Sequence, residues 1–406
     1  MRILYYGQHS MRTYSDPISY ALDKDGALHR QLARIAVLPK SYRWDLVLPI
    51  TADQHGGLLP PEFHKLRNDG YDIKVHYYVA PFNVMTQRFE TPSTRPFEEI
   101  KNVDVMLCEM PEHVGFFRMM QENKVLPEFP IVTKVLHVEL FDDTKPVLPY
   151  FWRQLEGISL SDHVVFPLRG IYEAFKAHAH ALLSPLAIKM LDRPTTIWNG
   201  MFTPKLLGPN KRAGSFDSNS FGAFLDPITF AFISRLSDDK RTKAAAFLEA
   251  MTVFKPGAEA QLWVADPTDM MGVKDFEHKE LVFGKFGNTR EDYVHTLRDV
   301  SDVVPILYDQ GLIASIGFCE AAWFRNVMVH PYSKAPDNLN GIGVQYDVPE
   351  DKTKMSKVIE AALVEAFEGI LDVHDNGSHD VEMIYDRRST DVEAEKMQED
   401  LESVVF

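Results

Sequence analysis

The 406-residue sequence is poor in cysteine and contains no long apolar run. Its two cysteines, Cys108 and Cys319, exclude a disulfide framework and give no metal-ligand spacing. No apolar stretch reaches the length that crosses a membrane, and the first residues, Met1–Gly7, are typical of a β-strand rather than a signal peptide. We therefore expect a cytoplasmic protein of a reducing compartment, with no membrane span and no metal.

An excess of positive charge is also lacking: 58 acidic residues face 43 Lys and Arg, which gives a net charge of −15. Such an acidic chain is a poor match for broad, non-specific nucleic-acid binding. The acidic excess lies in the second half, so the near-neutral first half can still hold a local basic patch. The sequence has neither the glycine fingerprint of dinucleotide dehydrogenases nor a phosphate-binding P-loop, which argues against both classes.

What the sequence does contain is a regular alternation of short apolar runs and amphipathic stretches. In the first half the predicted strands are 3–6, 46–50, 73–79, 103–108, 131–137, 163–166 and 195–198, and the predicted helices are 28–38, 61–68, 113–123, 149–156 and 171–182. In the second half the predicted strands are 228–234, 260–265, 280–283, 303–307 and 327–330, and the predicted helices are 243–254, 290–300, 316–324, 351–370 and 381–402. This alternation predicts βαβ units and parallel sheets.

A polar, loop-rich segment separates the two halves. Glycine, proline, serine and asparagine are frequent from Pro204 to Gly222. We predict an N-terminal Rossmann-like domain over 1–205, a linker over 206–222, a second Rossmann-like domain over 223–375 and an acidic helical tail over 376–406.

The strongest chemical signal follows the first strand of the second half. The apolar run that ends at Ser234 is followed by Arg235, and Lys240 comes five residues after that arginine, before a predicted helix. Strand-to-helix loops of α/β proteins bind phosphates, and an arginine with a lysine can clamp a diphosphate. The alternative is a pair of ordinary surface cations at the start of a helix.

This spacing resembles the donor-phosphate site of retaining GT-B glycosyltransferases, in which a Gly-Arg-Leu strand end precedes a lysine. Here Ser234 stands in place of the family's glycine, and Arg241 in place of the glycine after the lysine. Further along, Glu320-Ala321 resembles the family's Glu-Ala pair, whose glutamate binds the nucleotide ribose. The family's second glutamate, eight residues earlier, is replaced by Leu312.

The first half carries weaker parts of the same resemblance. His137 and Glu139 follow a strand end, as the family's sugar- and acceptor-binding histidine and carboxylate do, and Gly56-Gly57 resembles the loop that admits the donor sugar. For His137 a structural role in the core is an equal alternative, and Asp142 and Asp143 compete with Glu139 for the carboxylate role. For Glu320 the alternative is an ordinary glutamate on a helix surface. Asn199-Gly200 resembles the Asn-Gly turn at the end of the family's first domain and predicts positive φ angles.

Taken together, the resemblance implies a GT-B fold: two Rossmann-like α/β domains facing an interdomain cleft, with C-terminal helices packing back on the N-terminal domain. It implies transfer of a sugar from a nucleotide sugar, a UDP-sugar, to an acceptor hydroxyl with retention and without a cofactor. In that reading Arg235 and Lys240 bind the diphosphate, Glu320 the ribose, Gly56 and Gly57 the donor sugar, and His137 and Glu139 serve catalysis.

The acceptor is the least determined part. The chain is similar to phage enzymes that glycosylate hydroxymethylated pyrimidines, which implies double-stranded modified DNA as acceptor and the host cytoplasm as location. Candidate cations for a DNA-binding rim are Arg12, Lys40, Arg43, Arg88, Arg95 and Arg118. The alternatives are a glycan acceptor, a lipid acceptor with 28–38 as a membrane-surface helix, or a non-catalytic interaction protein on a degenerate GT-B scaffold.

Overall fold

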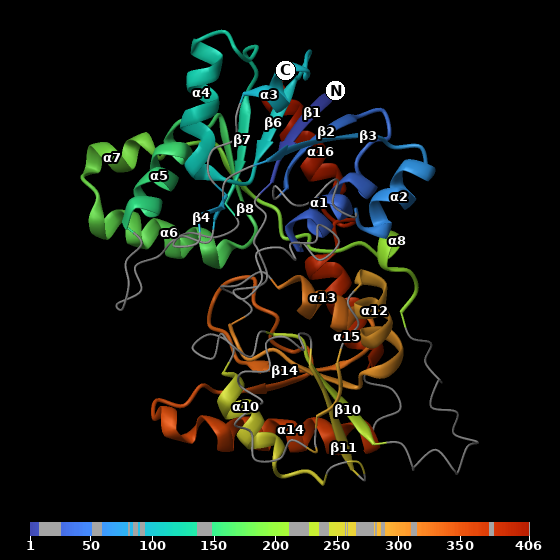
Figure 1. The fold of residues 1–406 in the computed structure, drawn as a ribbon. Coiled ribbons are helices and arrows are strands. Elements are labelled where there is room, and N and C mark those ends of the chain that lie inside the picture. Colours follow the sequence, from blue (N-terminus) through green and yellow to red (C-terminus); the bar gives the residue numbers. More distant parts are fainter. Residues whose placement is uncertain are drawn as a thin grey trace. The chain divides into compact units, whose positions relative to one another are not determined.

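The computed structural model describes residues 1–7, 26–50, 59–79, 82–83, 88–89, 94–135, 148–210, 227–234, 243–255, 257, 259–264, 280, 282–285, 289–309, 315–372 and 377–405. They form two compact units (Figure 1). Unit 1 comprises Met1–Leu206 together with Thr390–Phe406, and unit 2 comprises Leu207–Ser389.

Unit 1 is built on a seven-stranded parallel sheet in the order β3-β2-β1-β6-β7-β8-β9. Its strands are β1 (Arg2–Tyr6), β2 (Arg43–Ile50), β3 (Asp72–Val79), β6 (Val105–Cys108), β7 (Ile131–Lys134), β8 (His163–Phe166) and β9 (Thr195–Ile197). The small antiparallel pair β4 (Phe82–Asn83) and β5 (Arg88–Phe89) stands apart from it. The strand order reverses between β1 and β6, so the carboxyl ends of these two strands form the switch point where open α/β sheets bind ligands.

Helices cover both faces of this sheet. They are α1 (Gly26–Val37), α2 (Pro61–Asn68), α3 (Arg95–Glu98), α4 (Val114–Glu122), α5 (Leu148–Ser159), α6 (Arg169–Leu182), α7 (Pro185–Met190) and the C-terminal α16 (Ala394–Val405), with α8 (Pro204–Leu207) at the end of the unit. Successive residues of a strand point to opposite faces. The ring of Tyr6 packs on Phe97 of α3 and Phe117 of α4, whereas Tyr5 faces the side that α1 covers.

Unit 2 has a six-stranded parallel sheet in the order β12-β11-β10-β13-β14-β15. The strands are β10 (Ile228–Phe232), β11 (Ala260–Val264), β12 (Val282–Lys285), β13 (Val303–Pro305), β14 (Val327–Pro331) and β15 (Val344–Tyr346). The helices are α10 (Ala244–Met251), α12 (Arg290–His295), which continues as a π-helical turn over Thr296–Val300, α13 (Ile316–Trp323), α14 (Met355–Asp372) and α15 (Gly377–Arg388). The switch point of this sheet lies between β10 and β13.

The predicted alternation of strands and helices is confirmed, and both large sheets are parallel. The helical tail predicted over 381–402 is helical at both ends but not continuous. The chain forms two helices, α15 and α16, and between them it passes from unit 2 to unit 1 at Thr390. There the backbone N–H of Thr390 donates to the carbonyl of Phe202 at 2.9 Å, a tertiary contact that local sequence cannot signal.

The turn predicted at Asn199-Gly200 is also wrong in its backbone. Neither residue has a positive φ angle. Gly200 is needed for a different reason: a Cβ atom at this position would lie 2.7 Å from Cγ2 of Thr390. The glycine therefore admits the returning C-terminal segment, whose Glu393 accepts hydrogen bonds from the backbone N–H groups of both Asn199 and Gly200 at 2.7 Å.

Candidate functional site

Most residues that the sequence singles out for chemistry lie outside the described part of the chain. This holds for Gly56, Gly57, His137, Glu139, Arg235, Lys240 and Leu312. Their roles stay predictions. Glu320 is described, and so are the strand and helix ends around it at the carboxyl edge of the sheet of unit 2.

The N-terminus of α13 begins at the switch point of unit 2, after β13. Ser315 caps the helix, because its side chain accepts from the backbone N–H of Phe318 at 3.1 Å, and Tyr308 donates to the same hydroxyl at 3.1 Å. Gly317 brings this helix end close to β10: a Cβ here would lie 2.6 Å from Cδ1 of Ile233. The first N–H groups of a helix, with the positive end of its dipole, attract oxyanions.

Ser234 follows β10 at the same edge. Its hydroxyl oxygen is buried and makes no hydrogen bond within the residues that the structure describes. A buried hydroxyl without a partner is costly, and it can donate to a ligand oxygen. The serine that replaces the family's glycine therefore adds a side-chain donor where the sequence analysis predicts a diphosphate.

Glu320 forms a buried ion pair that the sequence analysis missed. It is 3% exposed on α13, and its two carboxylate oxygens accept from the two terminal nitrogens of Arg290, with Nη1 3.0 Å from Oε2 and a second bond from Nη2 to Oε1. The guanidinium of Arg290 also lies 5.2 Å from the ring centroid of Tyr293. A bidentate pair fixes the orientation of the carboxylate, and two of its lone-pair positions remain for further donors.

A local signal for Arg290 exists in the sequence. Thr289 and Asp292 form a capping box, so α12 begins at Arg290. Because α12 follows β12 in a parallel sheet, its first residue lies at the carboxyl edge, as the start of α13 does. The sequence could therefore have marked Arg290 as a candidate site residue. It could not have shown that Arg290 pairs with Glu320.

Three described members of the predicted DNA-binding rim, Lys40, Arg43 and Arg118, do not lie at a carboxyl edge. Arg43 is the first residue of β2 and pairs with Asp72 at 2.8 Å, and Lys40, which precedes the same strand, donates to the carbonyl of Asp69. Arg118 pairs with Asp162, the residue before β8. These cations are at the amino edge of the sheet and are bonded to the protein, so they do not form a basic rim beside a ligand site.

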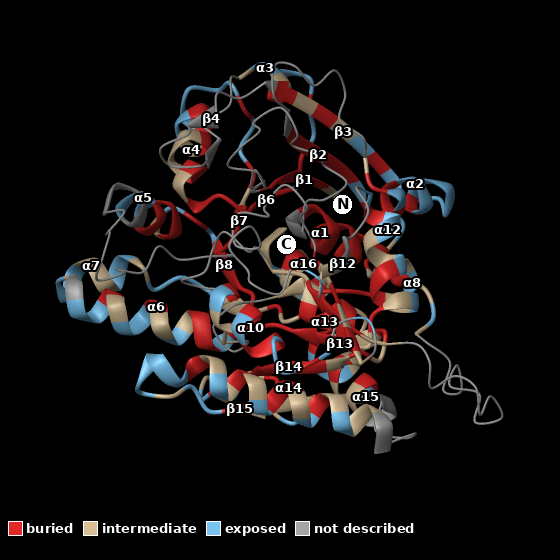
Figure 2. Ribbon diagram, turned by 60° about the horizontal axis from the view of Figure 1, so that its bottom comes forward, coloured by how far each residue is buried: buried red, intermediate tan, exposed pale blue. Residues whose placement is uncertain are grey.

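The membrane-surface helix considered for a lipid acceptor is wrong. Residues Leu28 to Ala36 of α1 are buried within unit 1, and Figure 2 draws this helix as buried. In the described part of the chain no helix is long and apolar enough to span a bilayer. The same residues contain no group of three or more side chains that could hold a metal ion.

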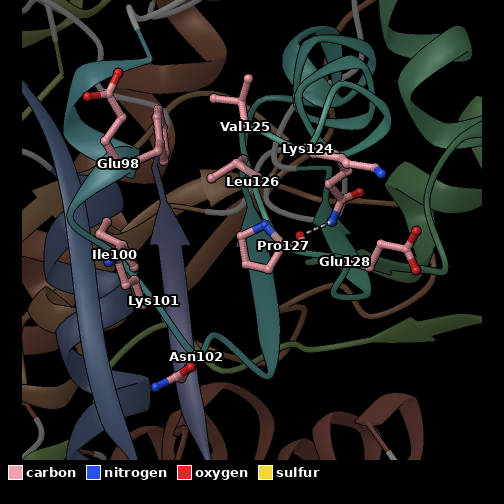
Figure 3. Close-up of a pocket in the computed structure, with 11 residues that line it drawn as sticks. Glu98, Ile100, Lys101, Asn102, Lys124, Val125, Leu126, Pro127 and Glu128 are labelled. Carbon is pink, nitrogen blue, oxygen red and sulfur yellow. Dashed lines mark hydrogen bonds between the residues drawn. The ribbon is translucent and has the colours of Figure 1, made fainter.

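A hollow of about 480 Å³ opens at the amino edge of the sheet of unit 1. Figure 3 shows it between the segment that precedes β6, with Ile100 and Lys101, and the segment that precedes β7, with Leu126 and Pro127. Open α/β sheets bind ligands at the opposite edge, so this hollow is not the candidate site.

No protein-family model matches the chain, and no curated protein matches its sequence. Solved structures do match its fold. A glycosyltransferase from Rickettsia africae matches with a TM-score of 0.56 at 11% identity, covering 100% of this chain and 98% of the other. The E. coli trehalose-6-phosphate protein bound with UDP-2-fluoro glucose matches with a TM-score of 0.57 at 11% identity, covering 99% of both chains.

A third match is a trehalose-6-phosphate synthase studied for glycosyl transfer with retention, with a TM-score of 0.59 at 12% identity and 99% of both chains covered. At such low identity these likenesses describe the architecture and not the chemistry. They cover the whole chain, and the predicted GT-B fold is confirmed.

Proposed function

We propose that this protein is a glycosyltransferase that moves a sugar from a nucleotide sugar to an acceptor hydroxyl. The observation that carries the proposal is the arrangement at the switch point of unit 2. There a capped helix start, the unpartnered hydroxyl of Ser234 and the oriented carboxylate of Glu320 meet at one edge of the sheet. Oxyanion and hydroxyl recognition at one edge is what a nucleoside diphosphate requires.

In this proposal the residues of unit 2 hold the donor. The start of α13 and Ser234, with Arg235 and Lys240, bind the diphosphate, whose negative charge grows as the sugar leaves. Glu320, held by Arg290, accepts hydrogen bonds from the ribose hydroxyls. The roles of Gly56 and Gly57 toward the sugar, and of His137 and Glu139 in catalysis, rest on the sequence resemblance alone.

We further propose a UDP-sugar donor and retention of the anomeric configuration. Both are supported by the sequence resemblance and by two neighbours of the same fold, one bound with UDP-2-fluoro glucose and one studied for transfer with retention. The nucleotide sugar is a co-substrate, and no resident cofactor is part of the proposal.

The acceptor predicted from the sequence, a hydroxymethylated pyrimidine in double-stranded DNA, rests on that resemblance only. The described cations Lys40, Arg43 and Arg118 give it no support. An electrophoretic shift with hydroxymethylated DNA at increasing salt would test it, since phosphate contacts weaken steeply with salt. Binding that does not depend on the hydroxymethyl group would reject it.

Donor binding has a sharp test at Glu320. We expect UDP to bind the wild-type protein more tightly than 2′-deoxy-UDP, and this difference to disappear in Glu320→Gln if the carboxylate accepts from the ribose 2′-hydroxyl. A hydrogen bond to a charged group contributes about 1.5–3 kcal/mol, which is roughly a 10- to 100-fold change in affinity. Calorimetric titration of both nucleotides against both proteins measures it. Arg235→Ala should lower the affinity for both nucleotides.

The control is Lys255→Ala, which removes an exposed i,i+4 pair with Glu259 and should leave both affinities unchanged. A discrimination between UDP and 2′-deoxy-UDP that survives in Glu320→Gln would assign Glu320 a purely structural role with Arg290. If the protein neither binds UDP nor hydrolyses any UDP-sugar of a donor panel, the glycosyltransferase proposal is rejected. Such a result would favour a non-catalytic scaffold.

A further inference from the structure

Unit 1 contains a group of basic and amide side chains at its own switch point. Arg30, Gln31 and Arg34 project from α1 toward Lys134, the last residue of β7, and we call these four residues the buried basic cluster. Glu109, which follows β6, lies among them and also accepts from Tyr5 of β1 at 2.7 Å. The cluster therefore occupies the carboxyl edge where the strand order of this sheet reverses.

Three cations of this cluster are almost completely removed from solvent. Arg30 is 7% exposed, Arg34 1% and Lys134 1%. Burial lowers the pKa of Lys134 well below its usual value, and it lowers the pKa of Arg34 to about 10, with Arg30 adding to that effect. The positive charges are thus both desolvated and close enough to repel one another.

The nearby carboxylates do not balance this charge. Glu109 pairs with Lys134, and its Oε1 lies 3.8 Å from Nη1 of Arg34, beyond hydrogen-bond distance. Glu393 also attracts Arg34, but its oxygens accept from the backbone N–H groups of Asn199 and Gly200. Three basic side chains therefore share two carboxylates within the described surroundings of the cluster, and one of these carboxylates is already bonded to backbone N–H groups. A buried charge without a partner costs several kcal/mol.

The cluster has buried hydrogen-bond donors that lack acceptors in the part of the chain that the structure describes. Within the described chain, Nε of Arg30, Nε and Nη1 of Arg34, and Nε2 of Gln31 are buried and have no hydrogen-bond partner. All four atoms are donors. Nη1 of Arg30 reaches only the sulfur of Met201, at 3.9 Å, and Nη2 of Arg34 reaches the carbonyl of Gly200 at 3.4 Å. The cluster therefore lacks acceptors and negative charge together.

We propose that the buried basic cluster is a binding site for a phosphate oxyanion, either inorganic phosphate or the phosphoryl group of a phosphate monoester. Such a group has only acceptor oxygens and carries a charge of about −1.5 to −2 at pH 7, so it supplies both of the missing properties. Arginine forks bind it bidentately. The site belongs to unit 1 and does not depend on the nucleotide site proposed for unit 2.

The test follows the phosphate dependence of thermal stability and binding. We expect inorganic phosphate to raise the melting temperature of the wild-type protein along a saturable curve, since a ligand that binds only the folded state stabilises it by mass action. Non-specific salt effects instead grow steadily with concentration. Titrations with glucose 6-phosphate, inorganic phosphate and glucose then distinguish the two ligands. If the site takes a phosphate monoester, glucose 6-phosphate should bind at least tenfold more tightly than inorganic phosphate. If it takes free phosphate, glucose 6-phosphate and inorganic phosphate should bind alike, and glucose serves as the comparison without a phosphoryl group.

Arg30→Met is the decisive variant. If the arginine serves an anion, the variant should lose at least tenfold in phosphate affinity, while the phosphate-free protein melts at the same or a higher temperature, because an uncompensated buried cation has been removed. Gln31→Glu places a carboxylate inside the cluster and should have the same two effects, which covers the case that Arg30→Met does not fold. Arg43→Met, at the exposed amino edge, is the matched control and should retain the wild-type response.

A wild-type protein without a saturable phosphate response would overturn the proposal. So would an Arg30→Met protein that keeps its phosphate affinity, or one that is destabilised without phosphate, which would make the cluster a purely structural network. UDP affinity is measured on the same variants and should not change, so that failure of this site and failure of the nucleotide site are told apart.

Discussion

At the residue scale, both proposed sites depend on buried polar side chains. Glu320 was recognisable because it belongs to a Glu-Ala pair after a strand, but Arg290 lies 30 residues earlier and meets it only in the folded protein. The three members of the basic cluster on α1 appear in sequence as the polar positions of an amphipathic helix. Only the fold buries the two arginines beside Lys134 and leaves several of the donor atoms on α1 without a described acceptor.

Asp45 makes a prediction for pH at the same scale. It is 2% exposed, and it accepts from Nε of Arg2 at 2.6 Å and from Nε2 of His76 at 2.7 Å. Burial alone would raise the pKa of Asp45, but the hydrogen bonds from His76 and Arg2 outweigh it and lower the pKa to about 2. The folded state therefore binds this proton more weakly than the unfolded state, and the pair stabilises the protein above the unfolded pKa.

We expect Asp45 to contribute about 2 kcal/mol to the free energy of unfolding near neutral pH, with the contribution shrinking as the pH falls from about 4 toward about 2. Urea unfolding of the wild type and Asp45→Asn between pH 6 and pH 3 measures it, and the difference between the two curves should narrow at low pH. Asp72→Asn, in the exposed pair with Arg43, is the control and should cost little. A difference that is constant with pH would contradict the assignment.

At the scale of elements, close backbone approach sets which helices can pack together. Helix α5 crosses the 3₁₀ turn Pro111–His113 at Gly157, where a Cβ would lie 1.7 Å from the carbonyl oxygen of Pro111. The helix predicted over 149–156 ends just before Gly157, whereas α5 continues to Ser159. Helix propensity treats a glycine as a reason to stop, and the contact that requires it is visible only in the fold.

Gly157→Ala should destabilise the protein by at least about 1–3 kcal/mol, because the methyl group overlaps a backbone atom that cannot move without displacing α5. Gly369→Ala in α14 is the matched substitution, since a Cβ there meets nothing within 4 Å. It should stabilise by roughly 0.5–1 kcal/mol through helix propensity. Chemical denaturation of both variants gives the comparison, and equal effects would show that the approach at Pro111 is not limiting.

At the scale of the whole molecule, the C-terminal segment belongs to the unit in which the chain begins. Met397 and Leu401 of α16 are 0% and 1% exposed and pack into the core of unit 1, and Asp400 accepts from the indole N–H of Trp198 at 2.8 Å. Unit 1 is therefore completed only after the chain has passed through unit 2, which makes its core strongly non-local.

Deletion of 390–406 should loosen unit 1 selectively. Two fully buried side chains of this size contribute about 1.5–3 kcal/mol each by burial, and the deletion also exposes the core that they cover. Hydrogen exchange followed by mass spectrometry should show faster exchange in β6 and α1, and unchanged exchange in β10 and β14. Equal acceleration in both units would mean that they unfold as one cooperative body rather than as two.

The sequence by itself determined the class of this protein. Short apolar runs alternating with amphipathic stretches dictate strands and helices through local side-chain periodicity, so the two parallel α/β units were predictable, and most element positions with them. The boundaries were less so: the strand predicted to reach His137 ends at Lys134, and α7 and β15 went unpredicted, because short elements with few buried residues carry little periodic signal.

The tertiary structure alone decided which side chains meet. The pairing of Arg290 with Glu320, the gathering of Arg30, Arg34 and Lys134 at one switch point, and the return of α16 to unit 1 all join residues far apart in the chain. Packing of apolar faces excludes water around these side chains, and a charge that has lost its water must find a partner in the fold. These depend on three-dimensional neighbours, and no local pattern in the sequence encodes them.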